Sequence, residues 1–287
     1  MINRSGGKED REMYTMNNGA ELPNPGYGTW KAHDADAFNG LRAALKAGYT
    51  HIDTAACYRN EPEVGTVLAD ADVDRDKLFI TTKCWNDHRG REAVKEALEE
   101  SLKKLQLDSV DLYLLHWPAN PAQYENWDEV NQSSWQGMID LYKEGKAKAI
   151  GVSNFTPKYL ASLMKMEVAP MVNQIEFHPG WTQPETVAYC KANNIVLEAW
   201  SPLGHGEVLN DPLIVSLAEK YDRTPAQICL RYVDQKGLVP LVKSVQEDRI
   251  VSNLAFKDFI LADEDVAAID ALPVTGWSGH NPDDIDF

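Results

Sequence analysis

Positive charge, cysteine and long apolar runs are all scarce in this chain of 287 residues. Lys and Arg total 28 against 44 Asp and Glu, which gives a formal net charge of −16. A surface this acidic repels polyanions, so neither nucleic acid nor an anionic membrane is expected as a partner. Because no stretch approaches about 18 consecutive apolar residues, no membrane-spanning helix is expected either. Any anion that binds must therefore find a local basic pocket.

The cysteines are few and scattered along the chain. Their positions contain no Cys-x-x-Cys pair, which argues against both a zinc knuckle and a small disulfide framework. We therefore expect free thiols and no metal site. The opening residues contain no apolar run of signal-peptide length, and together these features predict a cytoplasmic protein.

What the chain does have is a regular series of short apolar, β-branched or aromatic runs. Eight runs recur at intervals of about 30 residues, which is the size of one βα unit. Helical patterns fill the gaps: Phe38 and Leu41 recur at helical spacing before Gly48, and Thr224 followed by Pro225 is a typical helix start. The eight runs cover residues 27–30, 49–54, 78–83, 110–117, 147–154, 171–178, 195–202 and 238–245.

Eight alternating units favour one closed (β/α)8 barrel of parallel strands, an α/β TIM barrel. The rival, a doubly wound sheet that binds a dinucleotide, should carry three glycines after its first strand, and residues 26–31 and 204–209 each supply only two. We expect a single barrel domain over residues 13–287, preceded by a polar tail over residues 1–12. Asn18-Gly19 between two short runs predicts a β-hairpin ahead of the barrel.

Four chemically different side chains follow the ends of three successive predicted strands. Asp53 ends the second strand, Tyr58 follows in its loop, and Lys83 and His116 end the next two. The carboxyl ends of barrel strands are where active sites form. Each residue also has an ordinary structural alternative, since an Asp can cap a helix, a Lys can be solvated and a His can pack in a core.

Together the four residues can deliver a proton from Tyr58 to a substrate. An ammonium about 4 Å from a tyrosine hydroxyl contributes on the order of 4 kcal/mol, which predicts a Tyr58 pKa as much as about three units below its usual value of about 10. Tyr58 then acts as a general acid, while Asp53 holds Lys83 charged and His116 donates a hydrogen bond to the same carbonyl oxygen of a substrate.

The motifs around these residues resemble, in order, the signature blocks of the aldo-keto reductase superfamily. The blocks are GYTHIDTAACYRNEPEVG, TTKCW, LYLLHWP, IGVSNF, NQIEFHP, WSPLG and VKSVQEDRI. They span about residue 14 to the C-terminus and are most similar to short bacterial members such as 2,5-diketogluconate reductase. The resemblance implies a (β/α)8 barrel that binds NADPH without a Rossmann motif, with Asp53, Tyr58, Lys83 and His116 as its catalytic tetrad.

The resemblance also implies cofactor contacts. Ser153, Asn154 and Gln174 match residues that bind the nicotinamide carboxamide, and Trp200 stands where the family usually has a stacking tyrosine. Further matched contacts are Ser201, Leu203, Ser244, Val245 and Asn253, although Ser252 replaces the glutamate usual before Asn253.

Two basic residues bear on the choice between NADPH and NADH. Lys243 and Arg249 lie six positions apart and can converge on a phosphate, with Arg offering a fork and Lys a point charge. Both match the family's 2′-phosphate contacts, so NADPH is expected over NADH. Without the resemblance, the segment VKSVQEDRI is also compatible with an exposed surface whose charged side chains contact only water.

Substrate contacts are expected from tryptophans. Trp30, Trp85 and Trp117 are predicted to form an aromatic wall over the nicotinamide, and His116 also contacts the substrate. Trp277 is a possible lid from a C-terminal loop over the active site, although each tryptophan is also compatible with core packing. Cys57 and Cys84 are interpreted as packing residues, because neighbours on a strand point to opposite faces.

The sequence therefore predicts a monomeric NADPH-dependent reductase that converts aldehydes or ketones to alcohols. A second hypothesis is an NADPH-binding sensor or structural protein on the same barrel with little turnover. A metal-dependent barrel hydrolase is the weakest alternative, because only His116 and His178 end predicted strands.

Overall fold

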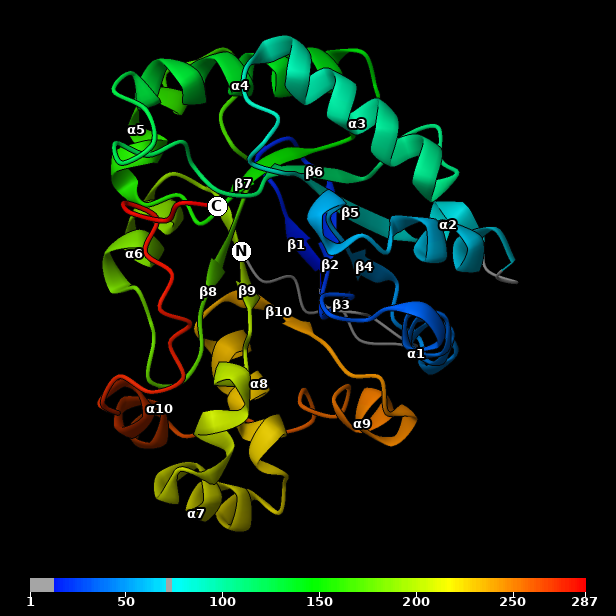
Figure 1. Cartoon of the computed structure of the whole chain (residues 1–287). Coiled ribbons are helices and arrows are strands. Elements are labelled where there is room, and N and C mark those ends of the chain that lie inside the picture. The colour runs from blue at the N-terminus through cyan, green and yellow to red at the C-terminus, as the bar shows by residue number, and fades with distance from the viewer. Residues whose placement is uncertain (1–12, 71–73) are drawn as a thin grey trace.

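A computed structural model describes residues 13–70 and 74–287, and it confirms the predicted (β/α)8 barrel (Figure 1). The parallel strands close in the order β10-β3-β4-β5-β6-β7-β8-β9. The bounds are β3 (Gly26–Gly28), β4 (His51–Asp53), β5 (Phe79–Cys84), β6 (Leu112–Leu115), β7 (Ile150–Ser153), β8 (Val172–Glu176), β9 (Val196–Trp200) and β10 (Leu238–Val242). Six strands lie within their apolar runs, whereas β3 begins one residue before its run and β5 ends one residue after its run. The polar tail expected over residues 1–12 lies outside the described residues.

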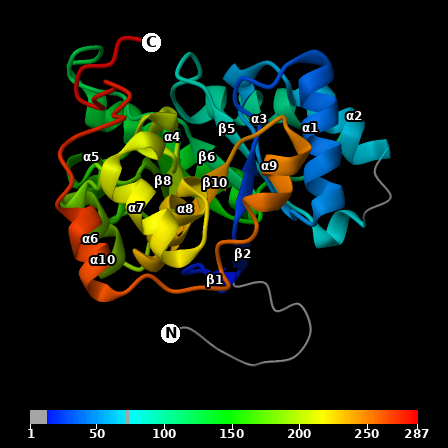
Figure 2. The same ribbon diagram turned by 90° about the horizontal axis from the view of Figure 1, so that it is seen from below.

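The predicted hairpin precedes the barrel and covers its amino-terminal end. Strands β1 (Met13–Thr15) and β2 (Glu21–Pro23) are antiparallel, and the turn between them contains Gly19 with a φ of 85°. The Asn17 and Asn18 side-chain amides donate to backbone carbonyls of the loops that lead into β8 and β7. Figure 2 shows the hairpin and the C-terminal tail at opposite ends of the barrel, so the hairpin leaves the carboxyl ends of the strands open.

An outer ring of helices surrounds the strands, as Figure 1 shows. Thr224 and Gln227 form a capping box at the start of α8, with Pro225 in its first turn, and α1 ends at Gly48. The helices are α1 (Asp34–Ala47), α2 (Glu61–Asp70), α3 (Arg91–Leu105), α4 (Trp127–Lys143), α5 (Pro157–Leu163), α6 (Pro184–Ala192), α7 (Pro212–Tyr221), α8 (Pro225–Gln235), α9 (Glu247–Ser252) and α10 (Asp263–Asp270). Short 3-10 helices are η1 (Ala56–Tyr58), η2 (Arg75–Lys77) and η3 (Gly204–Asn210).

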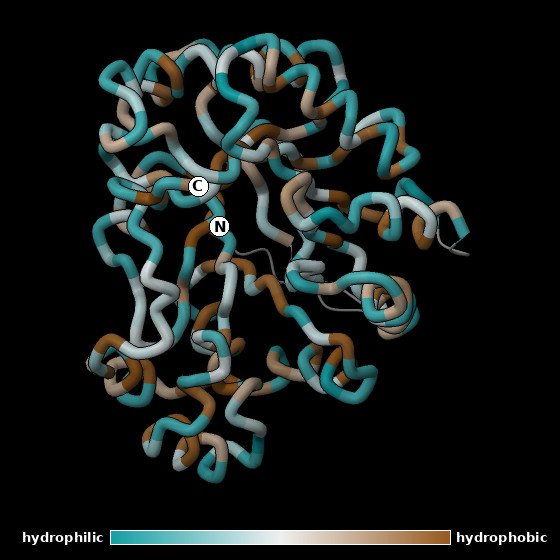
Figure 3. The backbone as a smooth tube through the Cα atoms, viewed as in Figure 1, coloured by the Kyte–Doolittle hydropathy of each residue, from teal (hydrophilic) through white to brown (hydrophobic). Residues whose placement is uncertain are grey.

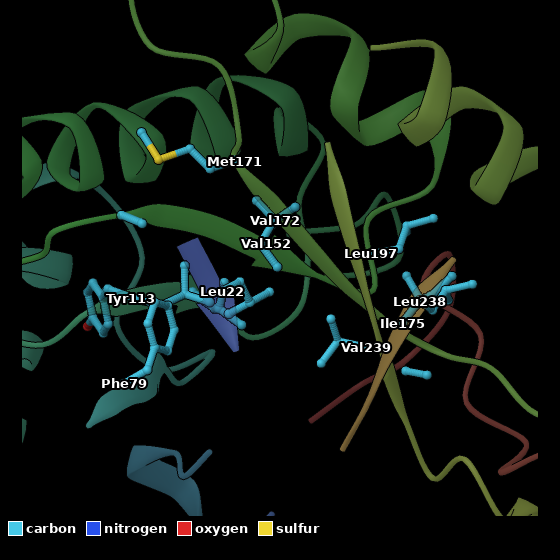
Figure 4. Packing of buried hydrophobic residues seen from close by; sticks show 14 of the residues in the cluster. Leu22, Phe79, Tyr113, Val152, Met171, Val172, Ile175, Leu197, Leu238 and Val239 are labelled. Atoms are coloured by element: carbon cyan, nitrogen blue, oxygen red, sulfur yellow. The ribbon is translucent and has the colours of Figure 1, made fainter. Parts of the chain in front are cut away.

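The hydrophobic core lies between the strands and this ring. Hydropathy alternates along the helices, as expected when one face packs inward (Figure 3). Val152, Val172, Ile175 and Leu197 are among the buried residues of this core (Figure 4). None of the helices in the described part of the chain is long and apolar enough to cross a membrane.

Several polar side chains of the strands point to the inside of the barrel. Successive side chains on a strand point to opposite faces, so the neighbours of core-facing residues point inward. The inward residues hydrogen bond or pair with one another across the barrel. They are His51, Asp53, Thr81, Lys83, Gln174 and Glu198, and each has an exposed fraction of at most 3%.

Candidate active site

A buried ammonium lies at the centre of the predicted site. Lys83 on β5 is fully buried, and its Nζ donates to Asp53 Oδ1 at 2.6 Å and to the Thr54 carbonyl at 3.0 Å. Tyr58 comes from η1, just after β4, and its Oη lies 3.3 Å from the same Nζ. The structure therefore brings together three side chains that the sequence placed at two strand ends and a loop.

The pKa values of this group follow from burial and from the charges inside it. Burial alone lowers the pKa of Lys83, but the Asp53 carboxylate and the Tyr58 hydroxyl outweigh burial and the pKa is raised. Burial raises the pKa of Tyr58 by more than Lys83 lowers it. The expected net lowering of the Tyr58 pKa was therefore wrong. Tyr58 carries its proton at neutral pH, as a proton donor must.

His116 stands beside Tyr58, with ring centroids 5.7 Å apart. Burial, together with Lys83 and Arg89, keeps the pKa of His116 well below its usual range, so the ring is neutral at pH 7. A neutral imidazole has one N–H donor and one acceptor nitrogen. It can therefore donate one hydrogen bond toward a substrate oxygen without carrying a charge.

The two cysteines near the site differ in position. Cys57 lies in the 3-10 helix η1, and its Sγ is 3.6 Å from His116 Nδ1. The argument that strand neighbours point to opposite faces therefore does not apply to Cys57, and its interpretation as a packing residue stays a prediction. Burial raises the pKa of Cys57 to about 12, so the thiol keeps its hydrogen. Cys84 ends β5, and its thiol contacts the backbone carbonyls of Trp85 and His88.

The residues expected to hold the nicotinamide carboxamide form one connected group. Asn154, with a φ of 64°, donates to the Ser153 hydroxyl at 3.0 Å and accepts from Trp200 Nε1 at 2.8 Å. Ser153 in turn donates to the Gln174 backbone carbonyl at 2.8 Å. The Gln174 side-chain amide gives its hydrogens to Asp53 Oδ2 and Glu198 Oε2, both at 2.9 Å. Its carbonyl oxygen is therefore the atom left to accept from a ligand's amide.

Lys243 and Arg249 are arranged differently from the buried groups. Lys243 follows directly after β10, at the same end of the barrel as Asp53, and Arg249 lies on α9. Both side chains are exposed, and in residues 13–70 and 74–287 no ion pair holds either of them. Exposed cations of this kind suit an anion that arrives from solution.

The other matched cofactor residues line the loops after β9 and β10. Ser201 has a φ of 50° and Leu203 is half-buried against the core. The Ser244 carbonyl accepts from the Tyr27 hydroxyl at 2.7 Å, which fixes the end of β10. The two remaining residues are the half-buried Val245 and the buried Asn253.

Aromatic rings surround the opening beside His116. Trp85 lies edge-on to His116 at 5.1 Å and stacks on Phe287 at 5.6 Å. Trp117 makes edge contacts with Phe287 at 5.7 Å and with Trp200 at 6.5 Å. We call Trp85, Trp117, Trp200 and Phe287 the aromatic wall. Two of the predicted tryptophans, Trp85 and Trp117, therefore lie beside His116 or Trp200, and their contact with substrate stays a prediction.

The two other predicted tryptophans lie apart from this wall. Trp30 is exposed, its ring centroid lies 6.4 Å from that of His205, and Lys31 lies over its ring. Trp277 stacks on Trp181 at 4.9 Å. Among the described rings, Phe287 stacks on Trp85, and the role of Trp277 as a lid stays a prediction.

Two residues at the candidate active site were not predicted from the sequence. Phe287 gave no local signal, because its place depends on where the C-terminal tail packs; the Asn86 side chain holds its backbone carbonyl at 2.8 Å. Glu198 did give a signal, since it is a lone charge between Leu197 and Ala199 in a buried strand.

The whole barrel matches known proteins. The Aldo/keto reductase family matches residues 24–273. Glyoxal reductase of Bacillus subtilis (strain 168) is 43% identical over 279 residues, 96% of this chain and 98% of that protein. The structure of an aldo-keto reductase from a Medee basin deep-sea metagenome library has a TM-score of 0.89 at 39% identity, covering 95% of this chain and 99% of that one. The Bombyx mori aldo-keto reductase in complex with NADP has a TM-score of 0.84 at 37% identity, covering 96% and 95%.

Proposed function

Because the chain belongs to the aldo/keto reductase family and its cofactor is NADPH/NADP+, we propose that it reduces small aldehydes and ketones to alcohols with Tyr58 as the general acid. The observation that carries this proposal is the Tyr58 hydroxyl 3.3 Å from the buried Lys83 ammonium. A buried ammonium paired with a carboxylate keeps its charge, so it stabilises negative charge on the hydroxyl as the proton leaves.

Each residue of the site has a separate role in carbonyl reduction. Bound NADPH supplies the hydride. Tyr58 gives its proton to the oxygen that becomes the alcohol, and Lys83 stabilises the phenolate that forms. Asp53 holds Lys83 charged and in place. The neutral His116 donates a hydrogen bond to the substrate oxygen, which polarises and orients the carbonyl.

The described residues fit the cofactor at both of its ends. Gln174 has given both amide hydrogens to carboxylates, so its carbonyl oxygen suits the carboxamide NH2 of nicotinamide. Ser153 and Asn154 lie beside it, and Trp200 offers an aromatic face. Lys243 and Arg249 are exposed cations at the same barrel end, which supports their role as contacts of the 2′-phosphate and the choice of NADPH over NADH.

The aromatic wall supports a preference for small carbonyl compounds with little charge. Trp85, Trp117 and Phe287 present apolar rings beside His116 and help to exclude water. We infer α-dicarbonyl aldehydes as the first substrates to test, because the 43% identical relative is a glyoxal reductase. A monomeric state and a cytoplasmic location stay predictions from the sequence.

Turnover assays test this proposal directly. We expect NADPH absorbance to fall with glyoxal, methylglyoxal and simple aldehydes, and more slowly with NADH. Tyr58→Phe should abolish turnover, whereas Tyr189→Phe on the outer helix α6 should not. If the protein binds NADPH but turns over none of these compounds, the alternative of a sensor or structural protein is favoured.

A further inference from the structure

A second carboxyl group lies inside the barrel below the proposed catalytic residues. Glu198 is fully buried in β9, between two residues whose side chains face the core. Its Oε2 accepts from Gln174 Nε2 at 2.9 Å. Its Oε1 has no hydrogen-bond partner among the described residues, and it lies 3.5 Å from His51 Nε2. A buried oxygen without a partner is costly and calls for an explanation.

Glu198 is connected to the proton donor through a short chain of contacts. The same Gln174 nitrogen that donates to Glu198 also donates to Asp53 Oδ2 at 2.9 Å. The other Asp53 oxygen binds Lys83, which in turn contacts Tyr58. Gln174 is therefore held between two carboxyl groups, and its orientation depends on both of them.

The geometry shows where a proton on Glu198 would sit. His51 Nδ1 lies 3.1 Å from the Pro23 carbonyl, an acceptor, so the ring's hydrogen belongs on Nδ1 and its Nε2 is an acceptor. That acceptor lies 3.1 Å from the Thr81 hydroxyl and 3.5 Å from Glu198 Oε1, so both oxygens face it. A neutral Glu198 with its hydrogen on Oε1 can donate toward His51 while Oε2 still accepts from Gln174.

The protonation states agree with this arrangement. Burial, assisted by the Asp53 charge, raises the pKa of Glu198 to about 8, and burial lowers the pKa of His51 to about 4. Both groups are therefore neutral at pH 7. The charges that face Glu198 are Asp53 from β4 and Lys83 from β5, which compensate each other; β8 contributes the neutral Gln174, and β10 contains no ionisable side chain.

Ionisation of Glu198 changes this balance. A second carboxylate across Gln174 from Asp53 leaves the barrel interior with one uncompensated negative charge. That charge opposes the formation of a phenolate on Tyr58, and it pulls the Gln174 amide toward Glu198. Both effects slow proton donation to the substrate.

We propose that Glu198 is a positioning residue for carbonyl reduction: as a neutral acid it fixes Gln174 and Asp53 so that Lys83 stays against Tyr58, and its ionisation slows the reaction. This inference rests on the proposed function. Because the pKa of Tyr58 is raised above its usual value, Tyr58 itself does not titrate near pH 8. We therefore assign the expected loss of reduction rate near that pH to Glu198, and a variant that cannot ionise tests the assignment.

Glu198→Gln and Glu198→Ala test the proposal, with Glu61→Gln as the matched control. Gln keeps the shape and the hydrogen bonds of the neutral acid but cannot ionise. Glu61 is buried to the same degree and bonds to Thr82 rather than to Gln174. In wild type, kcat for aldehyde reduction should fall several-fold as the pH rises through about 8. Glu198→Gln should remove that fall, Glu61→Gln should keep it, and Glu198→Ala should lower kcat about tenfold with a smaller change in KM.

A spectroscopic readout on the protein alone provides the second arm. Difference infrared spectra of wild type minus Glu198→Gln should show a protonated carboxyl band at pH 7 that converts to a carboxylate band above pH 8. This measurement needs neither cofactor nor turnover, and it does not depend on whether Glu198→Ala folds.

The outcomes separate the two proposals. If Tyr58→Phe is inactive but Glu198→Gln has the wild-type pH profile, the role of Glu198 is wrong while the proposed function stands. An ionised Glu198 band at pH 7 overturns the role as well. If Tyr58→Phe keeps wild-type turnover, the proposed function fails whatever the Glu198 variants do.

Discussion

The charged groups inside the barrel and those on the segment after β10 are held in opposite ways. Lys83 is fully buried, and Asp53, Thr54 and Tyr58 all contact its ammonium. Lys243 and Arg249 are exposed, and the described chain offers them no ion pair. A buried charge must be compensated by the protein itself, whereas an exposed one is stabilised by water until an anion displaces it. We therefore expect the interior to set the rate and the outer segment to set cofactor affinity.

Removing the buried ammonium is the largest expected change. Lys83→Met should lower kcat by roughly 10²- to 10⁴-fold and destabilise the fold by roughly 3–5 kcal/mol, because it leaves the buried Asp53 carboxylate without its cationic partner. Steady-state kinetics and denaturant unfolding measure the two effects. The double variant Asp53→Asn with Lys83→Met should recover stability without recovering activity. Equal loss of stability in the single and double variants would contradict the compensation argument.

Removing an exposed cation should act on binding alone. Arg249→Ala or Lys243→Ala should raise the NADPH Kd by roughly 10- to 100-fold, because a charge-assisted hydrogen bond contributes about 1.5–3 kcal/mol. The NADH Kd and the kcat at saturating NADPH should stay within about twofold. Lys46→Ala, an exposed lysine paired with Glu247, is the control. A similar loss of NADH affinity would mean that these residues do not contact the 2′-phosphate.

The buried ionisable groups should also make the free energy of unfolding depend on pH. Glu198 loses its proton near pH 4.5 when unfolded and near 8 when folded, so the free energy of unfolding falls with rising pH in between. His51 titrates near 6.5 unfolded and near 4 folded, so its contribution rises with pH in that range. The two cancel up to about pH 6.5, which leaves a net fall of about 2 kcal/mol at most between pH 6.5 and 8.

Denaturant unfolding at pH 6.5, 7.3 and 8 measures this fall. Glu198→Gln should abolish it, and Glu61→Gln should leave it unchanged. An identical slope in wild type and Glu198→Gln would assign the fall to another group.

The smallest expected effect is that of ionic strength on the affinities for NADPH and NADH. The 2′-phosphate meets exposed cations, and such pairs are screened as the ionic strength rises. NADPH affinity measured by fluorescence quenching should therefore fall a few-fold more than NADH affinity between low and high salt. Parallel salt dependences for the two cofactors would argue against a phosphate contact on the outer segment.

The same contrast explains what the sequence could predict. The proximity of Asp53, Tyr58, Lys83 and His116 could be predicted because strand ends are local features and the barrel gathers them at one end. The direction of the Tyr58 pKa was missed, because burial outweighs Lys83 and burial is a property of the closed barrel. The contact of Glu198 with Gln174 depends on the register of β8 and β9, and Phe287 reaches Trp85 only through the packing of the tail.

The most direct test of the account is a single-turnover experiment on Tyr58→Phe at saturating NADPH, with NADPH binding measured in parallel. The account predicts that the rate of NADPH oxidation by glyoxal falls by at least about a hundredfold, while the Kd for NADPH stays within about twofold of wild type. A wild-type rate in this variant would contradict the assignment of Tyr58 as the proton donor.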